Sequence, residues 1–82
     1  SGEHNTLIVH NQDVPGHVAA VTAALMQRHV NIATMQLYRN EQGGYAVMVL
    51  ECDQPIPTDL EQWLSHIEGI RKITVFNQEG AL

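Results

Sequence analysis

The segment from Asn11 to Gly16 carries the side chains best suited to binding chemistry. It follows a β-rich run and leads directly into a helical pattern, so backbone N–H groups at Gly16, His17 and Val18 should face it. A carboxylate would bind at this positive end of the helix dipole. Asp13 can receive an ammonium group, and the Asn11 amide both donates and accepts hydrogen bonds. Because an amino acid carries these two charges close together, the loop predicts an amino-acid site.

The same loop also has a purely structural interpretation. Asp13 would then cap the following helix, and Asn11 would be an ordinary turn residue. Both interpretations stay open at this point.

The histidines and the cysteine predict no catalytic or metal site. The five histidines are not spaced four residues apart on one helix face, and no cysteine joins them. A metal-responsive site using His10 or His17 remains a lesser alternative. Cys52 is interpreted as a small hydrophobic residue at the end of a strand.

Charge and composition exclude several classes of partner. Four Lys and Arg against nine Asp and Glu give a net charge of −5, which disfavours nucleic acid and anionic membrane surfaces. Arg28, Arg39 and Arg71 are expected to lie away from the Asn11–Gly16 loop, which argues against a phosphate cradle and hydrolysis.

Length and targeting signals indicate a single small domain in a reducing compartment. The chain has 82 residues, enough for one core, and a single cysteine. No apolar run is long enough to span a membrane, and the first residues do not resemble a signal peptide. We therefore expect a soluble, cytoplasmic domain over residues 6–77, with tails at residues 1–5 and 78–82.

Hydrophobic periodicity divides the chain into six short elements. Extended patterns predict four strands, and a period near 3.6 residues predicts two helices. The expected strands are Thr6–His10, Ile32–Tyr38, Tyr45–Leu50 and Ile70–Phe76, and the expected helices run from Gly16 to His29 and from Thr58 toward Gly69.

Helix and turn signals mark the boundaries of these elements. Asn31 is read as the residue that ends the first helix, and the paired glycines Gly43 and Gly44 as a hairpin turn. Thr58 to Glu61 matches a capping box, and Gly69 is expected to supply a left-handed stop.

The element order predicts an α+β fold, the ferredoxin-like βαββαβ sandwich. Both helices should cover one face of a four-stranded antiparallel sheet, with the first and third strands in the centre. The third strand, Tyr45–Leu50, is apolar on both alternations, which predicts cover on both of its faces. The exposed second strand and the partly apolar free face favour self-association.

At the level of motifs, the chain resembles ACT domains, the small regulatory modules of amino-acid metabolism. The resemblance rests on Asn11 to Gly16 followed by Asn31 and Ile32, and it extends over nearly the whole chain. Arg39, the paired glycines and the run from Glu51 to Asp53 are similar to the ACT domain of bacterial iron–sulfur L-serine dehydratase. The serine-responsive domain of D-3-phosphoglycerate dehydrogenase is a weaker match.

The resemblance implies that L-serine, or another small amino acid, binds at the interface of a homodimer or higher homo-oligomer and regulates a catalytic domain. The family often has histidine at the position of Asn11 and asparagine at that of Asp13, which alters the contacts. The implied ligand-binding residues are Asn11, Asp13, Val14, Pro15, Gly16, His17, Asn31 and Ile32.

The resemblance also locates the catalysis outside this chain. A 4Fe–4S cluster is implied for the catalytic domain of the parent dehydratase, and no cofactor is expected here. The alternative of a purely structural dimerisation or docking module without a ligand stays open.

Overall fold

The computed structural model describes residues 4–40 and 44–78, and for Asn40 it describes the backbone alone. The elements are β1 (Asn5–Gln12), α1 (His17–Gln27), β2 (Ile32–Asn40), β3 (Tyr45–Cys52), α2 (Thr58–Ser65) and β4 (Ile70–Phe76). The hairpin turn expected at Gly43 and Gly44 lies largely outside the described residues, although Gly44 itself has a φ of 69°.

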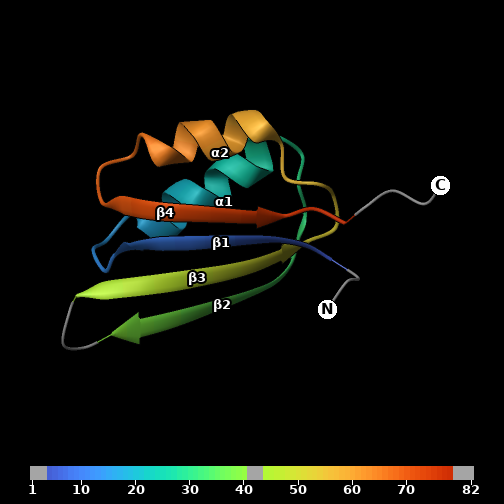
Figure 1. The fold of residues 1–82 in the computed structure, drawn as a ribbon. Helices are drawn as coiled ribbons and strands as arrows, with labels where there is room; N and C mark the ends of the chain where they lie inside the picture. The colour runs from blue at the N-terminus through green and yellow to red at the C-terminus, as the bar shows by residue number, and fades with distance from the viewer. Residues whose placement is uncertain (1–3, 41–43, 79–82) are drawn as a thin grey trace.

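The strands form one antiparallel sheet in the order β2-β3-β1-β4, and both helices lie on the same face of it (Figure 1). This confirms the predicted ferredoxin-like sandwich, with β1 and β3 in the centre. It also confirms that the second strand lies at an edge.

The core lies between the sheet and the helices. Alternate residues of β1 and β3 face the helices and are buried, as the two-residue period of a strand requires. The fully buried side chains of this core include Leu7, Val9, Val21, Leu25, Met48, Leu50, Cys52, Leu60 and Leu64.

The other face of the sheet has no helix over it. Ile8, Val47 and Val49 belong to the central strands, yet on this face they are only half-buried. The expectation that Tyr45–Leu50 is covered on both faces is therefore wrong for the single chain. The reason is that both crossover connections place their helices on one side.

The boundaries of α1 and β1 differ from the predicted ones. α1 ends at Gln27, and the left-handed residue after it is His29, with a φ of 58°, so Asn31 does not end the helix. β1 runs from Asn5 to Gln12, longer than predicted, and takes in Asn5, a residue assigned from the sequence to the tail.

The predicted capping box of α2 is wrong. Pro57 is the N-cap residue in extended conformation, and Thr58 already lies inside the helix, so its hydroxyl does not cap it. α2 ends at Ser65, and Gly69, with a φ of 94°, adopts the expected left-handed conformation in the turn that follows.

Within residues 4–40 and 44–78, no helix is long and apolar enough to cross a membrane. In the same ranges, no three His, Cys, Asp or Glu side chains are grouped in a way that could hold a metal ion.

Candidate functional site

The loop between β1 and α1 is held by backbone hydrogen bonds to two other turns. The N–H of Gln12 donates to the carbonyl of Gly69 at 2.8 Å, and the N–H of Asp13 donates to the carbonyl of Gly44 at 2.7 Å. The N–H of Val14 donates back to the carbonyl of Gln12 at 2.9 Å. These bonds fix the loop against the two neighbouring turns.

The N-terminus of α1 has no side-chain cap. Gly16 is the N-cap residue, with a φ of 99°, and no side-chain hydrogen bond caps the helix. The first N–H groups of a helix have no acceptor within it, so they can bind an anion. The structural interpretation of Asp13 as the cap of this helix is therefore wrong.

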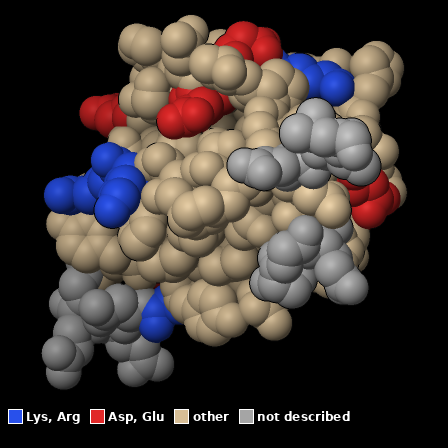
Figure 2. Space-filling view, turned by 45° about the vertical axis from the view of Figure 1, so that its right-hand side comes forward, with Lys and Arg blue, Asp and Glu red and all other residues tan. Residues whose placement is uncertain are grey.

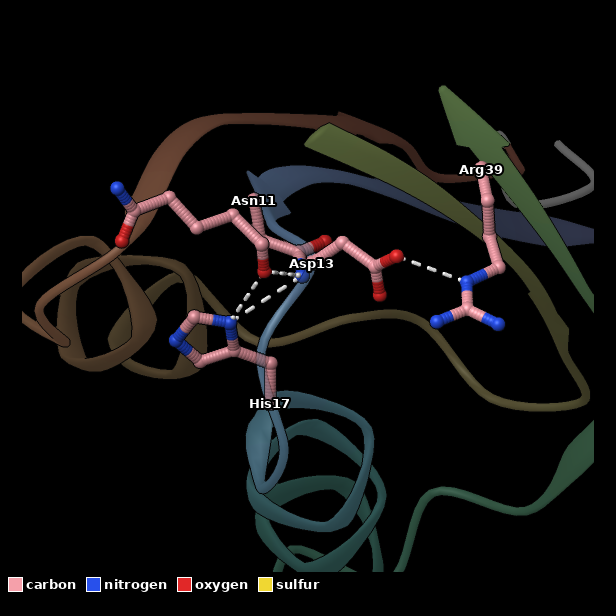
Figure 3. A network of polar contacts seen from close by, with 5 residues as sticks. Asn11, Asp13, His17 and Arg39 are labelled. Carbon is pink, nitrogen blue, oxygen red and sulfur yellow. Dashed lines mark hydrogen bonds and ion pairs between the residues drawn. The ribbon is translucent and has the colours of Figure 1, made fainter. Parts of the chain in front are cut away.

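The Asp13 carboxylate pairs instead with Arg39 at the far end of β2. Oδ2 of Asp13 accepts a hydrogen bond from Nε of Arg39 at 2.8 Å. Figure 3 shows the two side chains pointing toward one another. The expectation that Arg39 lies away from the loop is wrong, because the strand register places Arg39 level with Ala46 of β3 and Asn11 of β1, where the loop begins.

The loop and β2 enclose a hollow of about 370 Å³. The loop contributes Asp13 to Gly16, and β2 contributes Leu37 and Arg39. The hollow therefore combines one anionic group, one cationic group and the uncapped helix end. This combination is complementary to a molecule that carries both an ammonium and a carboxylate.

The side chains of Asn11 and His17 are buried behind the loop. Nδ1 of His17 lies 2.8 Å from the carbonyl oxygen of Gln12 and 3.2 Å from Nδ2 of Asn11 (Figure 3). Nε2 of His17 lies 2.9 Å from the carbonyl oxygen of Glu68. Oδ1 of Asn11 is buried and has no partner among the described residues. In this arrangement Asn11 supports the loop from inside, and its predicted contact with a ligand stays a prediction.

Asn31 and Ile32 lie at the other end of β2 and line a separate hollow of about 200 Å³ with Met26 and Val30. Nδ2 of Asn31 donates to Oδ2 of Asp53 at 2.7 Å. One copy of the chain thus keeps Asn31 apart from the Asp13 loop. The Asp13 loop of one copy and the Asn31 of a second copy can contribute to one site if the β2 strands of the two copies lie side by side.

Sequence reasoning missed Arg39 and Leu37 as site residues. The register of the β2–β3 hairpin is the feature of the sequence that could have identified them. Arg39 pairs with Ala46 across the β2–β3 hairpin, and Ala46 pairs with Asn11 on β1. Counting these pairs places the side of β2 that carries Leu37 and Arg39 next to the loop.

The predicted role of Cys52 as a small hydrophobic residue agrees with its position. The side chain is fully buried at the end of β3, in the core. Burial, followed by the neighbouring Asp53 carboxylate, raises the pKa of the thiol from 9.0 to about 11.

Two enzymes of serine metabolism contain similar segments. The D-3-phosphoglycerate dehydrogenase of Methanocaldococcus jannaschii is 34% identical over 70 residues, which is 85% of this chain and 13% of that enzyme. The probable L-serine dehydratase beta chain of Bacillus subtilis is 31% identical over 74 residues, 90% of this chain and 34% of the relative. The chain therefore corresponds to a small part of the first and about a third of the second.

Solved structures support the fold. A formyltetrahydrofolate deformylase from Pseudomonas putida superposes with a TM-score of 0.76 at 18% identity, over 88% of this chain and 28% of that one. The ACT domain of GTP pyrophosphokinase from Chlorobium tepidum superposes with a TM-score of 0.66 at 20% identity, over 88% and 95% of the two chains. Residues 5–65 match the ACT domain family. The chain therefore belongs to the ACT domain family, a module of the regulatory amino-acid-binding kind.

Proposed function

We propose that this chain senses L-serine between two copies of itself and thereby regulates an iron–sulfur L-serine dehydratase. The observation that carries the proposal is the hollow at the uncapped N-terminus of α1, where Asp13 and Arg39 present one charge of each sign. A free amino acid is the simplest metabolite that matches both charges and the exposed N–H groups.

The ligand pose follows from the charges. The ammonium group would bind the Asp13 carboxylate, and the carboxylate would accept hydrogen bonds from the first N–H groups of α1 and from Arg39. The existing ion pair is weak enough to be replaced, because the Arg39 side chain is 64% exposed and exposed pairs contribute about 0–1 kcal/mol.

The second copy is proposed because β2 leaves an unpaired strand edge beside an exposed apolar surface. β2 lies at the edge of the sheet, and Met35 and Leu37 are 44% and 41% exposed although their register partners on β3 are buried in the core. An exposed edge of this kind is a template for pairing with another strand. Pairing would also bury these apolar side chains.

A two-fold axis through the middle of β2 would complete the site. Antiparallel pairing of two identical strands puts the start of one beside the end of the other. Asn31 precedes β2 and Arg39 lies near its end. Asn31 of the second copy would therefore lie near the Asp13 loop of the first, where its amide can bind the serine hydroxyl or carboxylate.

Binding between copies would couple the ligand to the state of the enzyme. A ligand that binds only the paired form stabilises it by RT ln(1 + [L]/Kd). Any difference in activity between the paired and unpaired forms then depends on the serine concentration.

The choice of dehydratase as parent rests on the extent of the match, not on the identity, which is 31% for the dehydratase beta chain and 34% for the dehydrogenase. The match to the beta chain covers 90% of this chain and 34% of the relative, against 85% and 13% for the dehydrogenase. An iron–sulfur cluster needs several thiolates. Cys52, the one cysteine of this chain, is buried in the core, so the 4Fe–4S cluster of the proposed parent dehydratase would need thiolates from other residues than these.

Calorimetric titration of the chain with L-serine tests the sensor. We expect saturable heat with the unmodified chain and none with Asp13→Ala. Asp59→Ala is the matched control, because Asp59 forms a similar exposed ion pair with Arg28 on the helix layer, and it should leave the heat unchanged. Absence of heat with the unmodified chain at millimolar L-serine would contradict the proposal.

A structural dimerisation module is the second candidate, and one observation favours it. The Asp13 carboxylate already has an ion-pair partner in Arg39, so its charge is balanced without a ligand. In that case the chain dimerises, titration with L-serine gives no heat of binding, and L-serine leaves the association constant of the dimer unchanged. Sedimentation with and without L-serine separates the two functions.

A further inference from the structure

The open face of the sheet carries a second hollow, which shares no lining residue with the hollow at Asp13. It has a volume of about 400 Å³, within the range of small-molecule sites, and lies where β1, β3 and the start of β4 meet. Tyr45 and Val47 form its apolar wall, and His10, Arg71 and Lys72 contribute the polar groups. None of its lining residues is acidic.

A β-bulge brings two cations to this one hollow. On β1 His10 and Asn11 are adjacent, but their partners on β4 are Lys72 and Ile70, so Arg71 is the extra residue. In a regular strand, neighbours such as Arg71 and Lys72 would point to opposite faces. The bulge breaks this alternation, and both side chains line the hollow.

The Arg71 guanidinium lies over an aromatic ring and has no acidic partner among the described residues. Its Cζ lies 4.5 Å from the centre of the Tyr45 ring. A cation–π contact does not use the N–H groups as hydrogen-bond donors to an oxygen, so they stay available to an acceptor. Within the described part of the chain, neither Arg71 nor Lys72 forms an ion pair.

Comparison with Arg28 shows that this arrangement is unusual in the molecule. Arg28 also lies over an aromatic ring, with Cζ 5.9 Å from the centre of Trp63, but its Nε donates to Asp59 at 2.9 Å and its Nη1 to the carbonyl of Ala24 at 3.2 Å. The chain carries a net charge of −5, yet two of its four Lys and Arg residues are adjacent at this hollow. Figure 2 shows a group of blue Lys and Arg atoms at the left of the view, with red Asp and Glu atoms just above it.

We infer that this hollow binds a small organic carboxylate, with the carboxylate on Arg71 and Lys72 and the carbon skeleton against Tyr45 and Val47. The planar fork of Arg71 matches both oxygens of a carboxylate. The apolar wall disfavours a bare inorganic anion, which would gain nothing from it. The site shares no residue with the hollow at Asp13, so it does not depend on the serine proposal.

Titration of the ¹⁵N-labelled chain at constant ionic strength tests the inference. Benzoate is the probe, acetate supplies the charge without the ring, and benzamide supplies the ring without the charge. We expect saturable benzoate-dependent shifts of the backbone amide signals of His10, Val47, Arg71 and Lys72. Acetate and benzamide should each bind at least about tenfold more weakly, because each lacks one of the two interactions.

Charge-removing variants then locate the binding. Arg71→Gln and Lys72→Gln should each weaken benzoate binding by about tenfold, and Arg28→Gln, which removes the same charge from the other stacked arginine, should have no effect. Arg71 and Lys72 are exposed, so these variants should fold, which their spectra would confirm. Equal shifts with all three probes, or equal benzoate affinity in Arg71→Gln and Arg28→Gln, would overturn the inference.

The readouts distinguish this site from the serine site. L-serine should move signals of the Asp13–Val18 segment, and benzoate those of the open sheet face. Failure of one titration therefore leaves the other interpretable.

Discussion

Asp13 and Arg39 show how much a single side-chain contact changes the meaning of a sequence motif. As a helix cap, Asp13 would be a local structural residue. Paired with Arg39 at 2.8 Å, it becomes half of a charge pair that matches both ends of an amino acid. The pair is exposed and therefore weak, so a ligand that supplies both counter-charges can replace it at little cost in stability.

Cys52 gives a prediction at the scale of one residue. Its pKa is raised from 9.0 to about 11 in the folded chain, so the unfolded chain loses the thiol proton first. The stability that this group contributes is therefore complete below about pH 9 and is lost as the pH rises from about 9 to 11. Urea unfolding across this range should show a steeper fall in the free energy of unfolding for the unmodified chain than for Cys52→Ala.

All groups other than Cys52 are the same in the unmodified chain and in Cys52→Ala. The difference between the two pH profiles therefore isolates the thiol, and parallel profiles would contradict the assignment. A thiol reagent offers a second measurement, because the buried neutral thiol should react at pH 8 only after unfolding.

At the scale of elements, the turn between α2 and β4 supports the Asp13 loop through Gly69 and His17. Gly69 accepts the hydrogen bond of the Gln12 N–H and has a left-handed φ of 94°. A Cβ at this position would lie 2.5 Å from Cε1 of His17. The turn therefore requires glycine both for its backbone conformation and for space.

Two glycine variants separate these requirements. Gly16→Ala has the same conformational cost but no atom within 4 Å of the new Cβ, so it should lower the free energy of unfolding by about 1 kcal/mol. Gly69→Ala must also displace the buried His17 ring and should cost about 3 kcal/mol. Thermal or urea unfolding measures both values.

The double variant His17→Ala with Gly69→Ala checks the cause. Removing the ring removes the clash, so the cost of Gly69→Ala should fall toward that of Gly16→Ala. If the costs of the two changes simply add, the contact with His17 does not explain them.

At the scale of the whole molecule, the sheet has two unlike edges. The β2 edge carries the exposed side chains Met35 and Leu37, and the hollow at Asp13 and the hollow at Asn31 lie at its two ends. The β4 edge ends at Phe76, which is 61% exposed. Association through β2 completes the proposed site. Association through β4 would leave the Asp13 loop and Asn31 in separate hollows.

Charge substitutions at the two edges distinguish these assemblies. Leu37→Glu should convert the dimer into a monomer and abolish serine binding, because it places like charges across the two-fold axis. Phe76→Glu is the matched control at the other edge and should remain dimeric. Sedimentation velocity measures both. A dimer that survives Leu37→Glu but is lost in Phe76→Glu would place the interface at β4.

The sequence by itself determined the order of the elements and their arrangement. Apolar periods of two and 3.6 residues distinguish strands from helices, and the right-handed connection rule then leaves one βαββαβ sandwich with β1 and β3 in the centre. The loop from Asn11 to Gly16 was recognisable too, because its proline, glycine and polar residues lie together in the chain. These features depend on local sequence, so they can be predicted without the tertiary structure.

Tertiary structure decided which groups meet. Arg39 reaches Asp13 through the pairing of three strands, and Arg71 joins Lys72 through a bulge that no residue type announces. Asn11 and His17 belong to the loop motif by sequence, yet packing buries their side chains behind it. Such contacts arise between residues far apart in the chain, and their register is set by the packing of the whole sheet, which local patterns do not encode.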